Sequence, residues 1–584
     1  MADWPARGHL IRRSLLAGWL FVAPAGAHAA PNLQLTGLEE VDLITNVGLS
    51  VPRVTFSCNA STAQIRRYVD AAARAAEEAL QAYGYFNARI EGRIDVRDDC
   101  RDPALHVEKG PVTTVRSVEI DLADSIESIE SVRSFVEENR PEVGAPLDQA
   151  AYDALRDGLL TRVQRLGYLD ARFSRHEIRV DPEEQAADIA LALEAGGRYR
   201  FGELDIEQTV LNPELARKMA GVERGAPYTS RNLLSINQNL SGAEYFDSVS
   251  VRPDLDRRED LAVPVDVVAR RSPRTSWELR AGYATDVGPR VGANVKRRYV
   301  NKRGHRWAAR TQLSAIEQRL NTSYSIPRSA DPLRERYDIY ARVTRHDNNS
   351  IVTTEAASGV QWVRETDRWT RSLFTEYLLD RTRYGDNPAE SQGFAVVGGR
   401  LGYDGLDDPL FPTRGVVFDV SLQGAAEPVL SAANFVRARG LVGGYHSLGR
   451  WIFAGRAEAG VISTDDFDSI PRSLRFFTGG DRSVRGYDYE SLSPRDEEGT
   501  RTGGKYLLVG SLEAMHPVVG DDWYLAGFVD TGNAYTDPEA DLKTGAGVGV
   551  RWRSPVGMVR LDVAQPLDGS GGLPRLHLGL GAAF

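Results

Sequence analysis

Two short motifs place an arginine and an aspartate where they could form a buried ion pair. They are Arg485-Gly486-Tyr487 and the alternating set Phe528, Asp530 and Gly532. An arginine in partly desolvated surroundings needs a carboxylate, and Arg485 and Asp530 can make a forked, charge-assisted contact. Gly486 lets the chain turn sharply or approach a wall closely. The alternative is a solvated arginine in an exposed loop; the two motifs together favour the ion pair.

The residue types that usually carry catalysis or bind metals are scattered along the chain. The nine histidines form no HExxH pattern, and no nucleophile elbow is present. Asp407, Asp408 and Pro409 precede Pro412 and Gly415 in a pattern typical of a turn between strands. We therefore expect no catalytic residues, no metal site and no cofactor.

The first thirty residues have the composition of an export signal. Arg12 and Arg13 precede the apolar run 15–23, and small residues lead to a cleavage site near Ala29 or Ala30. The paired arginines also admit the twin-arginine route, which we consider the weaker alternative to general secretion. The mature protein is expected to leave the cytoplasm.

The sequence has two cysteines, Cys58 and Cys100, both in the first region after the export signal. No CxxC spacing or histidine cluster accompanies them. In an oxidising compartment such a pair more often forms one structural disulfide than a metal or redox site. We expect a covalent link across the first module.

Net charge and hydropathy exclude further classes. A formal charge of −10 and an isoelectric point near 5.6 offer no basic surface for nucleic acid. Beyond residue 30, no run approaches the ~18 apolar residues that a membrane-spanning helix needs. A spanning segment must therefore be a β-strand. The mean hydropathy of −0.35 allows this, because barrel strands alternate apolar and polar residues.

The first half of the chain contains a repeat centred on Tyr85, Tyr168 and Tyr245, which lie 83 and 77 positions apart by subtraction. Apolar residues recur at helical spacing over 62–83 and 148–166, and period-two stretches follow. Each copy is predicted to run strand, helix, helix, strand, strand. The repeated aromatic residues are expected to seat each helix on its sheet rather than to bind a ligand.

The second half changes at Pro273 to aromatic- and glycine-rich segments with period-two alternation. Trp277 and Leu279 lie on one face, opposite Glu278 and Arg280. A soluble sandwich also alternates, but the export signal and the apolar, alternating last strand favour a membrane barrel. That strand contains Leu578, Leu580 and the terminal aromatic Phe584. At roughly 20 residues per strand and connection, residues 273 to 584 supply about 16 strands.

The two motifs resemble the VRGY/VRGF loop and the FxDxG strand of the superfamily that combines POTRA modules with an outer-membrane barrel, and the repeats resemble POTRA modules. The stretches 282–291, 474–477 and 543–552 make the chain more similar to the TamA family, the barrel subunit of the translocation and assembly module. The resemblance implies a loop that folds back into the barrel, with Arg485, Gly486 and Tyr487 facing the wall residues Phe528, Asp530 and Gly532.

The predicted architecture is therefore multidomain: three α+β POTRA modules followed by a 16-stranded antiparallel transmembrane β-barrel. The expected boundaries are a signal peptide at 1–30, modules at 31–110, 111–196 and 197–272, and a barrel at 273–584. The expected location is the bacterial outer membrane, with the modules in the periplasm.

The resemblance also implies a function and its partners. The expected function is insertion or export of autotransporters and other outer-membrane proteins. The expected partners are a TamB-like protein anchored in the inner membrane, unfolded outer-membrane protein or autotransporter substrates, and outer-membrane lipid. The alternatives are a two-partner secretion pore, which typically has two modules, and the general barrel assembly factor, which usually has five. The absence of catalytic motifs argues against an enzyme, and a diffusion porin would not need the modules.

The ends of the barrel sequence also predict a weak seam. Pro574, Gly579 and Gly581 in the last strand, and Gly282 in the first, remove side-chain contacts and one hydrogen-bond donor. Such a seam could open sideways to lipid or template an incoming strand.

Overall fold

The computed structural model describes residues 31–97, 100–285, 288–348, 351–384, 388–497, 499–555, 557–568 and 573–581. The predicted export signal at 1–30 and the terminal Phe584 lie outside these residues, as does the side chain of Leu580. No described helix is both long enough and apolar enough to cross a membrane.

Module one runs from β1 to β3 and has the predicted order of elements: β1 (Gln34–Thr36), α1 (Val41–Ser50), α2 (Thr62–Gln81), β2 (Arg89–Arg97) and β3 (Cys100–Glu108). The central β3 pairs with β1 in parallel and with β2 antiparallel. Ser61 caps α2 by accepting the N–H of Gln64. Residues of both helices pack against Leu105 and Val107 on the sheet, which forms the module's core.

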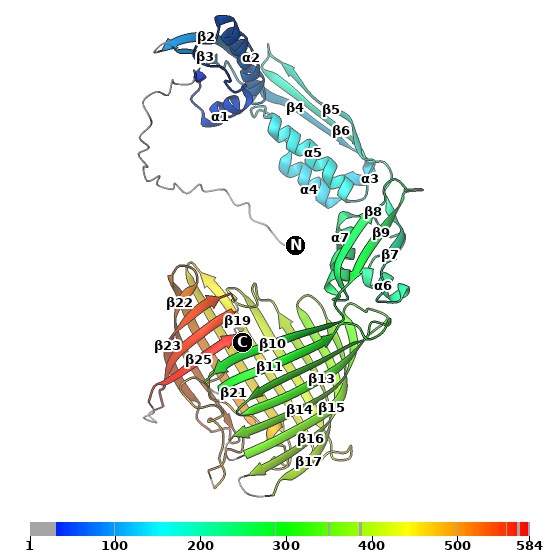
Figure 1. Ribbon diagram of the computed structural model, residues 1–584, viewed down its shortest axis with the longest axis vertical. Helices are drawn as coiled ribbons and strands as arrows, with labels where there is room; N and C mark the ends of the chain where they lie inside the picture. The colour runs from blue at the N-terminus through cyan, green and yellow to red at the C-terminus, as the bar shows by residue number, and fades with distance from the viewer. Residues whose placement is uncertain are drawn as a thin grey trace. The chain divides into compact units, whose positions relative to one another are not determined.

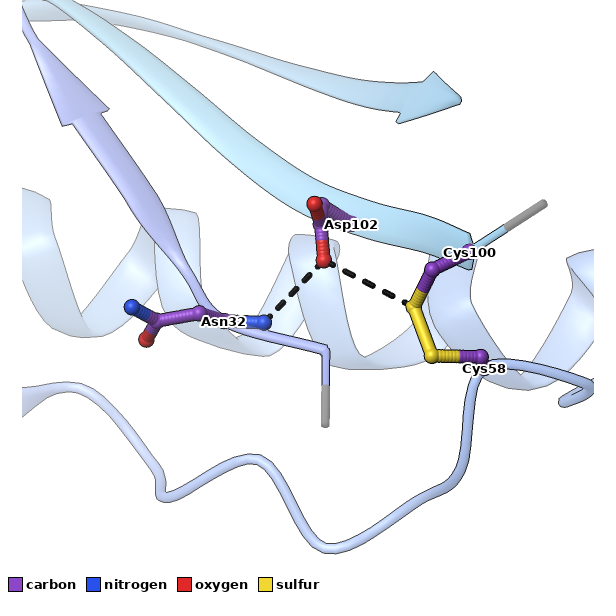
Figure 2. Close-up of a disulfide and its surroundings, with 4 residues drawn as sticks. All are labelled: Asn32, Cys58, Cys100 and Asp102. Carbon is purple, nitrogen blue, oxygen red and sulfur yellow. Dashed lines mark hydrogen bonds between the residues drawn. A yellow bond between two sulfur atoms is a disulfide. The ribbon is translucent and has the colours of Figure 1, made fainter. Parts of the chain in front are cut away.

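A disulfide joins Cys58 to Cys100 in module one. It ties the loop before α2 to the start of β3 (Figure 2). Beside it, Asp102 of β3 accepts the backbone N–H of Asn32 at 3.1 Å. The hydrogen bond holds the residues just before the three-residue strand β1 against β3, and the disulfide holds the loop before α2 against β3.

Module two contains β4 (Thr114–Leu122), α3 (Asp124–Glu127), α4 (Glu130–Asn139), α5 (Gln149–Arg165), β5 (Arg172–Asp181) and β6 (Ala186–Glu194). It has one helix more than predicted, because a single turn, α3, precedes α4. The sheet order is β4-β6-β5. Figure 1 shows α5 beside this sheet, where Tyr152 and Leu155 pack against Ile189 and Leu191.

Module three contains β7 (Arg200–Glu207), α6 (Pro213–Ala220), α7 (Ser230–Gly242), β8 (Phe246–Pro253) and β9 (Ala262–Arg271), with sheet order β7-β9-β8. In the first two modules, Gly84 and Gly167 follow the last helix with φ of +85° and +104°. Glu244 fills the same place in module three with φ of +62°. The left-handed turn is therefore kept where the repeat lacks glycine.

The barrel within the described residues is one antiparallel sheet of 16 strands, each paired with its neighbours in chain order. The strands are β10 (Thr275–Ala284), β11 (Gly288–Arg297), β12 (Arg306–Ser314), β13 (Glu317–Pro327), β14 (Glu335–Asn348), β15 (Ile351–Glu365), β16 (Trp369–Tyr384), β17 (Glu390–Asp404), β18 (Gly415–Ala425), β19 (Phe435–Leu448), β20 (Trp451–Ser463), β21 (Tyr506–Val519), β22 (Trp523–Tyr535), β23 (Lys543–Ser554), β24 (Gly557–Pro566) and β25 (Arg575–Gly581). The predicted strand number is confirmed.

The first and last strands of the barrel lie side by side (Figure 1). Across the described residues, however, no β-ladder joins β10 to β25, and the hydrogen-bonded sheet runs from one to the other around the wall. The described part of β25 has seven residues, whereas β16 has sixteen. We call this junction of β10 and β25 the seam.

Module three is attached directly to the barrel rim. The Tyr245 hydroxyl donates to the carbonyl of Gly304 at 2.5 Å and accepts from Nε of Arg306 at 2.9 Å. Glu244 forms an ion pair with Lys296. The third tyrosine of the repeat therefore does more than seat its helix, which was the predicted role, because it also fixes the module to the turn between β11 and β12.

Candidate functional site

A long segment between β20 and β21, residues 464–505, folds into the barrel interior and is called here the lumen loop. Because neighbouring strands are antiparallel and β10 starts beside module three, β20 ends at the opposite rim. The loop contains one short 3₁₀ helix, Arg472–Leu474. Isolated bridges join Phe476 to Gly504 and Thr478 to Leu492. These contacts give the loop a defined path back to the wall.

Arg485 lies on the lumen loop and faces Asp530 of β22. Its Nε donates to Oδ2 at 2.7 Å and its Nη2 donates to Oδ1 at 2.9 Å, so the contact is forked. The backbone N–H of Arg485 also donates to Oδ2 of Asp530, at 3.1 Å. The guanidinium stacks 3.4 Å from the ring centroid of Phe528. The structure thus brings together the arginine and aspartate of the two sequence motifs.

Two further carboxylates and a second arginine extend this pair into a cluster. Arg485 Nη1 lies 2.9 Å from Oε2 of Glu513 on β21 and 3.1 Å from Oδ2 of Asp562 on β24. Arg551 on β23 donates from Nε to Glu513 at 2.9 Å and also pairs with Asp562. Four adjacent strands, β21 to β24, therefore each contribute one charged group to the loop arginine or its partners.

Glycines allow the loop to approach the wall this closely. A Cβ on Gly545 of β23 would lie 1.9 Å from the carbonyl oxygen of Arg485, which no side chain can accommodate without displacing the loop. Gly486 has φ of +97°, and its N–H donates to Nε2 of His577 at 3.0 Å. The Tyr487 hydroxyl donates to the carbonyl of Thr544 at 3.3 Å. By contrast, a Cβ on Gly532 would meet the neighbouring strand at Leu508 and not the loop.

Burial alternates along the wall strands in the sense expected of a barrel in lipid. Asp530 is 1% exposed, whereas its neighbour Val529 is 40% exposed. The same reversal separates Asp562 from Leu561 and Val563. Charged side chains therefore face the interior and apolar side chains face outward.

The sequence and fold of this region match known proteins. Residues 300–584 match the Omp85 superfamily domain. The barrel is therefore similar to an Omp85 domain over most of its length. Residues 32–109 match the POTRA domain described as TamA domain 1. An amino-terminal segment similar to a POTRA domain therefore precedes a barrel similar to the Omp85 domain, in the order that the sequence motifs predicted.

Relatives described as outer membrane protein assembly factor BamA cover most of the chain. The protein from Nitratidesulfovibrio vulgaris is 24% identical over 520 residues, covering 83% of this chain and 64% of the relative. The Neisseria meningitidis serogroup B protein is 25% identical over 485 residues, covering 68% of this chain and 58% of the relative. The chain thus spans less than two thirds of the length of either protein.

A solved structure has a similar fold. The crystal structure of BamA from Haemophilus ducreyi lacking POTRA domains 1-3 has a TM-score of 0.68, with 15% identity, and covers 80% of this chain and 99% of that one. At this identity the likeness shows the fold alone. The protein is an outer-membrane barrel with its amino-terminal modules in the periplasm.

Sequence reasoning identified some residues of this loop site and missed others. The structure brings together Arg485, Gly486, Tyr487, Phe528 and Asp530 from the two motifs with their neighbours on β23 and the last strand. Glu513 and Arg551 were missed because each lies in an ordinary alternating strand, where a charge predicts only an inward-facing position. His577 was missed because an isolated histidine carries no motif.

The remaining predicted site residues lie away from the ion cluster. Leu578 of the last strand donates its backbone N–H to the hydroxyl of Thr285 at 2.9 Å.

The turn predicted at 407–415 connects β17 to β18, and Oδ1 of Asp408 accepts the N–H groups of Leu410 and Phe411 at 2.8 and 3.1 Å. These two hydrogen bonds lower the pKa of Asp408. Among the described residues, no group of three or more potential ligands is arranged to hold a metal ion.

Proposed function

We propose that this protein inserts or exports other outer-membrane proteins, autotransporters among them, through the seam of its barrel, in the manner of a TamA-like assembly factor. The observation that carries the proposal is the seam itself: β10 and β25 are neighbours, yet no ladder joins them within the described residues. In lipid, unpaired strand edges are costly because no water satisfies their backbone groups. An incoming strand of a substrate would satisfy them.

The periplasmic modules supply the second element of the proposal. Each has a three-stranded sheet whose outer strands, such as β2 and β5, are edges that an extended segment could join by strand addition. We propose that these edges dock unfolded substrates or a TamB-like partner anchored in the inner membrane. The relatives named as assembly factors support this assignment, although the chain spans only 64% and 58% of the first two.

The lumen loop supplies the third element. Arg485, Gly486 and Tyr487 are proposed to hold the loop against Asp530 and its neighbours so that the barrel keeps the shape that substrate entry requires. A two-partner secretion pore, the alternative, would instead pass a polypeptide through the lumen that this loop occupies.

Depletion of the protein, followed by quantitative mass spectrometry of outer membranes, tests the proposal. Cells complemented with wild type, with Arg485→Ala or with Arg482→Ala are compared. Arg482 is the matched control because it lies in the same loop but is exposed. We expect a subset of barrel proteins to be lost on depletion and with Arg485→Ala, and to be retained with Arg482→Ala. An unchanged barrel proteome with loss of one secreted polypeptide would replace the proposal with the secretion pore.

A further inference from the structure

We propose that Asp481 and His577 form a latch through which the lumen loop holds the two strands of the seam together. Both are positioning residues, and the inference rests on the proposed function, since it assigns the control of the seam to named side chains. The evidence is a set of contacts that takes the place of the missing ladder between β10 and β25.

Asp481 of the lumen loop contacts both sides of the seam. Its two carboxylate oxygens lie 3.3 and 3.2 Å from the hydroxyl of Thr285, at the turn that follows β10. One of them also pairs with Nδ1 of His577 on β25. Thr285 in turn accepts the N–H of Leu578 at 2.9 Å. One loop carboxylate therefore connects the first strand to the last.

The hydrogen bonds of His577 define its tautomer. The backbone N–H of Gly486 donates to Nε2, so Nε2 carries no proton in the neutral ring. Nδ1 then carries the proton and donates it to Asp481. The side chain is 6% exposed, which protects both bonds from water. His577 thus joins two points of the loop, Asp481 and Gly486, to the last strand.

The latch is anchored because the same loop segment is fixed to the continuous wall. Arg485, one residue before Gly486, binds Asp530 through its side chain and its backbone N–H. A third contact, the ion pair of Asp488 with Arg575, lies two residues before His577 on β25. The wall thereby sets the position of the loop, and the loop sets the position of the seam.

Distance measurements across the resting seam test the latch without any substrate. Nitroxide labels at Leu279→Cys on β10 and Leu576→Cys on β25 are read by double electron–electron resonance. The full-length protein is placed in nanodiscs of phosphatidylethanolamine and phosphatidylglycerol. Both leucines are exposed on the outer face, and the cysteines of the native disulfide do not react with the label.

We expect one narrow distance distribution for the labelled protein, and a loss of that peak with gain of longer distances for Asp481→Ala. His577→Phe, which keeps an aromatic ring without the two hydrogen bonds, should give the same change, and the double variant should add nothing. Asp481→Asn should retain the narrow peak, because the amide oxygen of the asparagine can still accept from Thr285 and His577. Arg482→Ala should leave the peak unchanged.

An unchanged distance distribution in both Asp481→Ala and His577→Phe would overturn the latch. Equal broadening by Arg482→Ala would also overturn it, as would loss of the narrow peak in Asp481→Asn. Circular dichroism and heat-modified mobility verify that each barrel is folded. The distance measurement needs no substrate, so it tests the latch separately from the proposed function. A protein that shows the latch but assembles no substrate would contradict the proposed function and not the latch.

Discussion

The continuous wall and the seam of this barrel are held together by different means. From β21 to β24, backbone ladders join every strand, and buried charges on those strands bind the lumen loop. At the seam, the described residues of β10 and β25 share no ladder, and the contacts come from side chains of Thr285, Asp481 and His577. The wall is therefore stabilised by many cooperative hydrogen bonds, whereas the seam depends on a few that can be broken singly.

This difference explains how a stable barrel could have the opening seam that we propose. A ladder cannot be released locally without exposing backbone groups to lipid, which is costly. Side-chain contacts from a loop can be exchanged at a smaller cost, because each hydrogen bond contributes about 1 kcal/mol. The loop is fixed to the wall, which is joined by ladders, and its contacts reach the seam, which we propose opens.

The largest effect is expected from Arg485→Ala, which removes the cation that faces Asp530, Asp562 and Glu513. Glu513 and Asp562 keep Arg551, but Asp530 becomes a buried carboxylate without its ion-pair partner, which should destabilise the barrel by about 3–5 kcal/mol. Urea unfolding in detergent, followed by tryptophan fluorescence, measures this change. Arg482→Ala provides the exposed comparison, and a loss equal to that of Arg485→Ala would show that burial of the cluster is irrelevant.

The next effect is expected from Gly545→Ala, where the new Cβ would overlap the carbonyl oxygen of Arg485. Overpacking of this kind costs about 1–3 kcal/mol. Limited proteolysis should cleave the lumen loop faster in this variant. Gly527→Ala is the control, since a Cβ there would meet nothing within 4 Å. Equal cleavage rates in the two variants would show that the position of the loop does not depend on its close approach to the wall at Gly545.

A smaller effect is expected where module three is attached to the barrel rim, through the contacts of Tyr245 with Gly304 and Arg306. Tyr245→Phe removes the hydroxyl and should destabilise the attachment of module three by about 1 kcal/mol. Hydrogen exchange followed by mass spectrometry should be faster in the turn 298–305. Tyr85→Phe in module one is the matched control, and faster exchange in that turn for both variants would contradict the local role of Tyr245.

The smallest effect is expected from an exposed ion pair in module two. Arg116 lowers the pKa of Asp188 to about 2, and Ser117 contributes a second hydrogen bond. Because the folded-state pKa lies below the unfolded value, this contribution is present above about pH 4 and is lost as the pH falls from about 4 to about 2. Asp188→Asn should therefore flatten the acid unfolding curve only slightly. A change as large as that of Arg485→Ala would show that exposed and buried pairs are equivalent here.

Much of this architecture was predictable from period and spacing. The helices expected over 62–83 and 148–166 are present as Thr62–Gln81 and Gln149–Arg165, and the alternation after Pro273 corresponds to the 16 strands. These features are local, so the sequence determines them directly. The pairing of Arg485 with Asp530 was predictable because each lies in a recognisable motif.

The rest of the site depends on register and could not be read locally. Glu513, Arg551 and Asp562 meet only because the three ladders that join β21 to β24 bring them to one level of the wall. Asp481 and His577 are 96 positions apart and meet only because the lumen loop folds inward. The left-handed conformation of Glu244 was also not predictable from its residue type, because glycine usually fills such a place, as it does in the other two copies.

The most direct test of the seam as the exit for substrates is a reversible lock. Thr285→Cys and Leu578→Cys place two thiols where the strands touch, and Leu279→Cys with Ala293→Cys places a second pair within the ladder of β10 and β11. Each purified variant is reconstituted in liposomes and assayed for insertion of an unfolded barrel substrate, with each single-cysteine variant as a control.

We predict that oxidation of the seam pair abolishes insertion and that reduction restores it, while oxidation of the ladder pair has no effect. Full insertion by the oxidised seam pair would contradict the account.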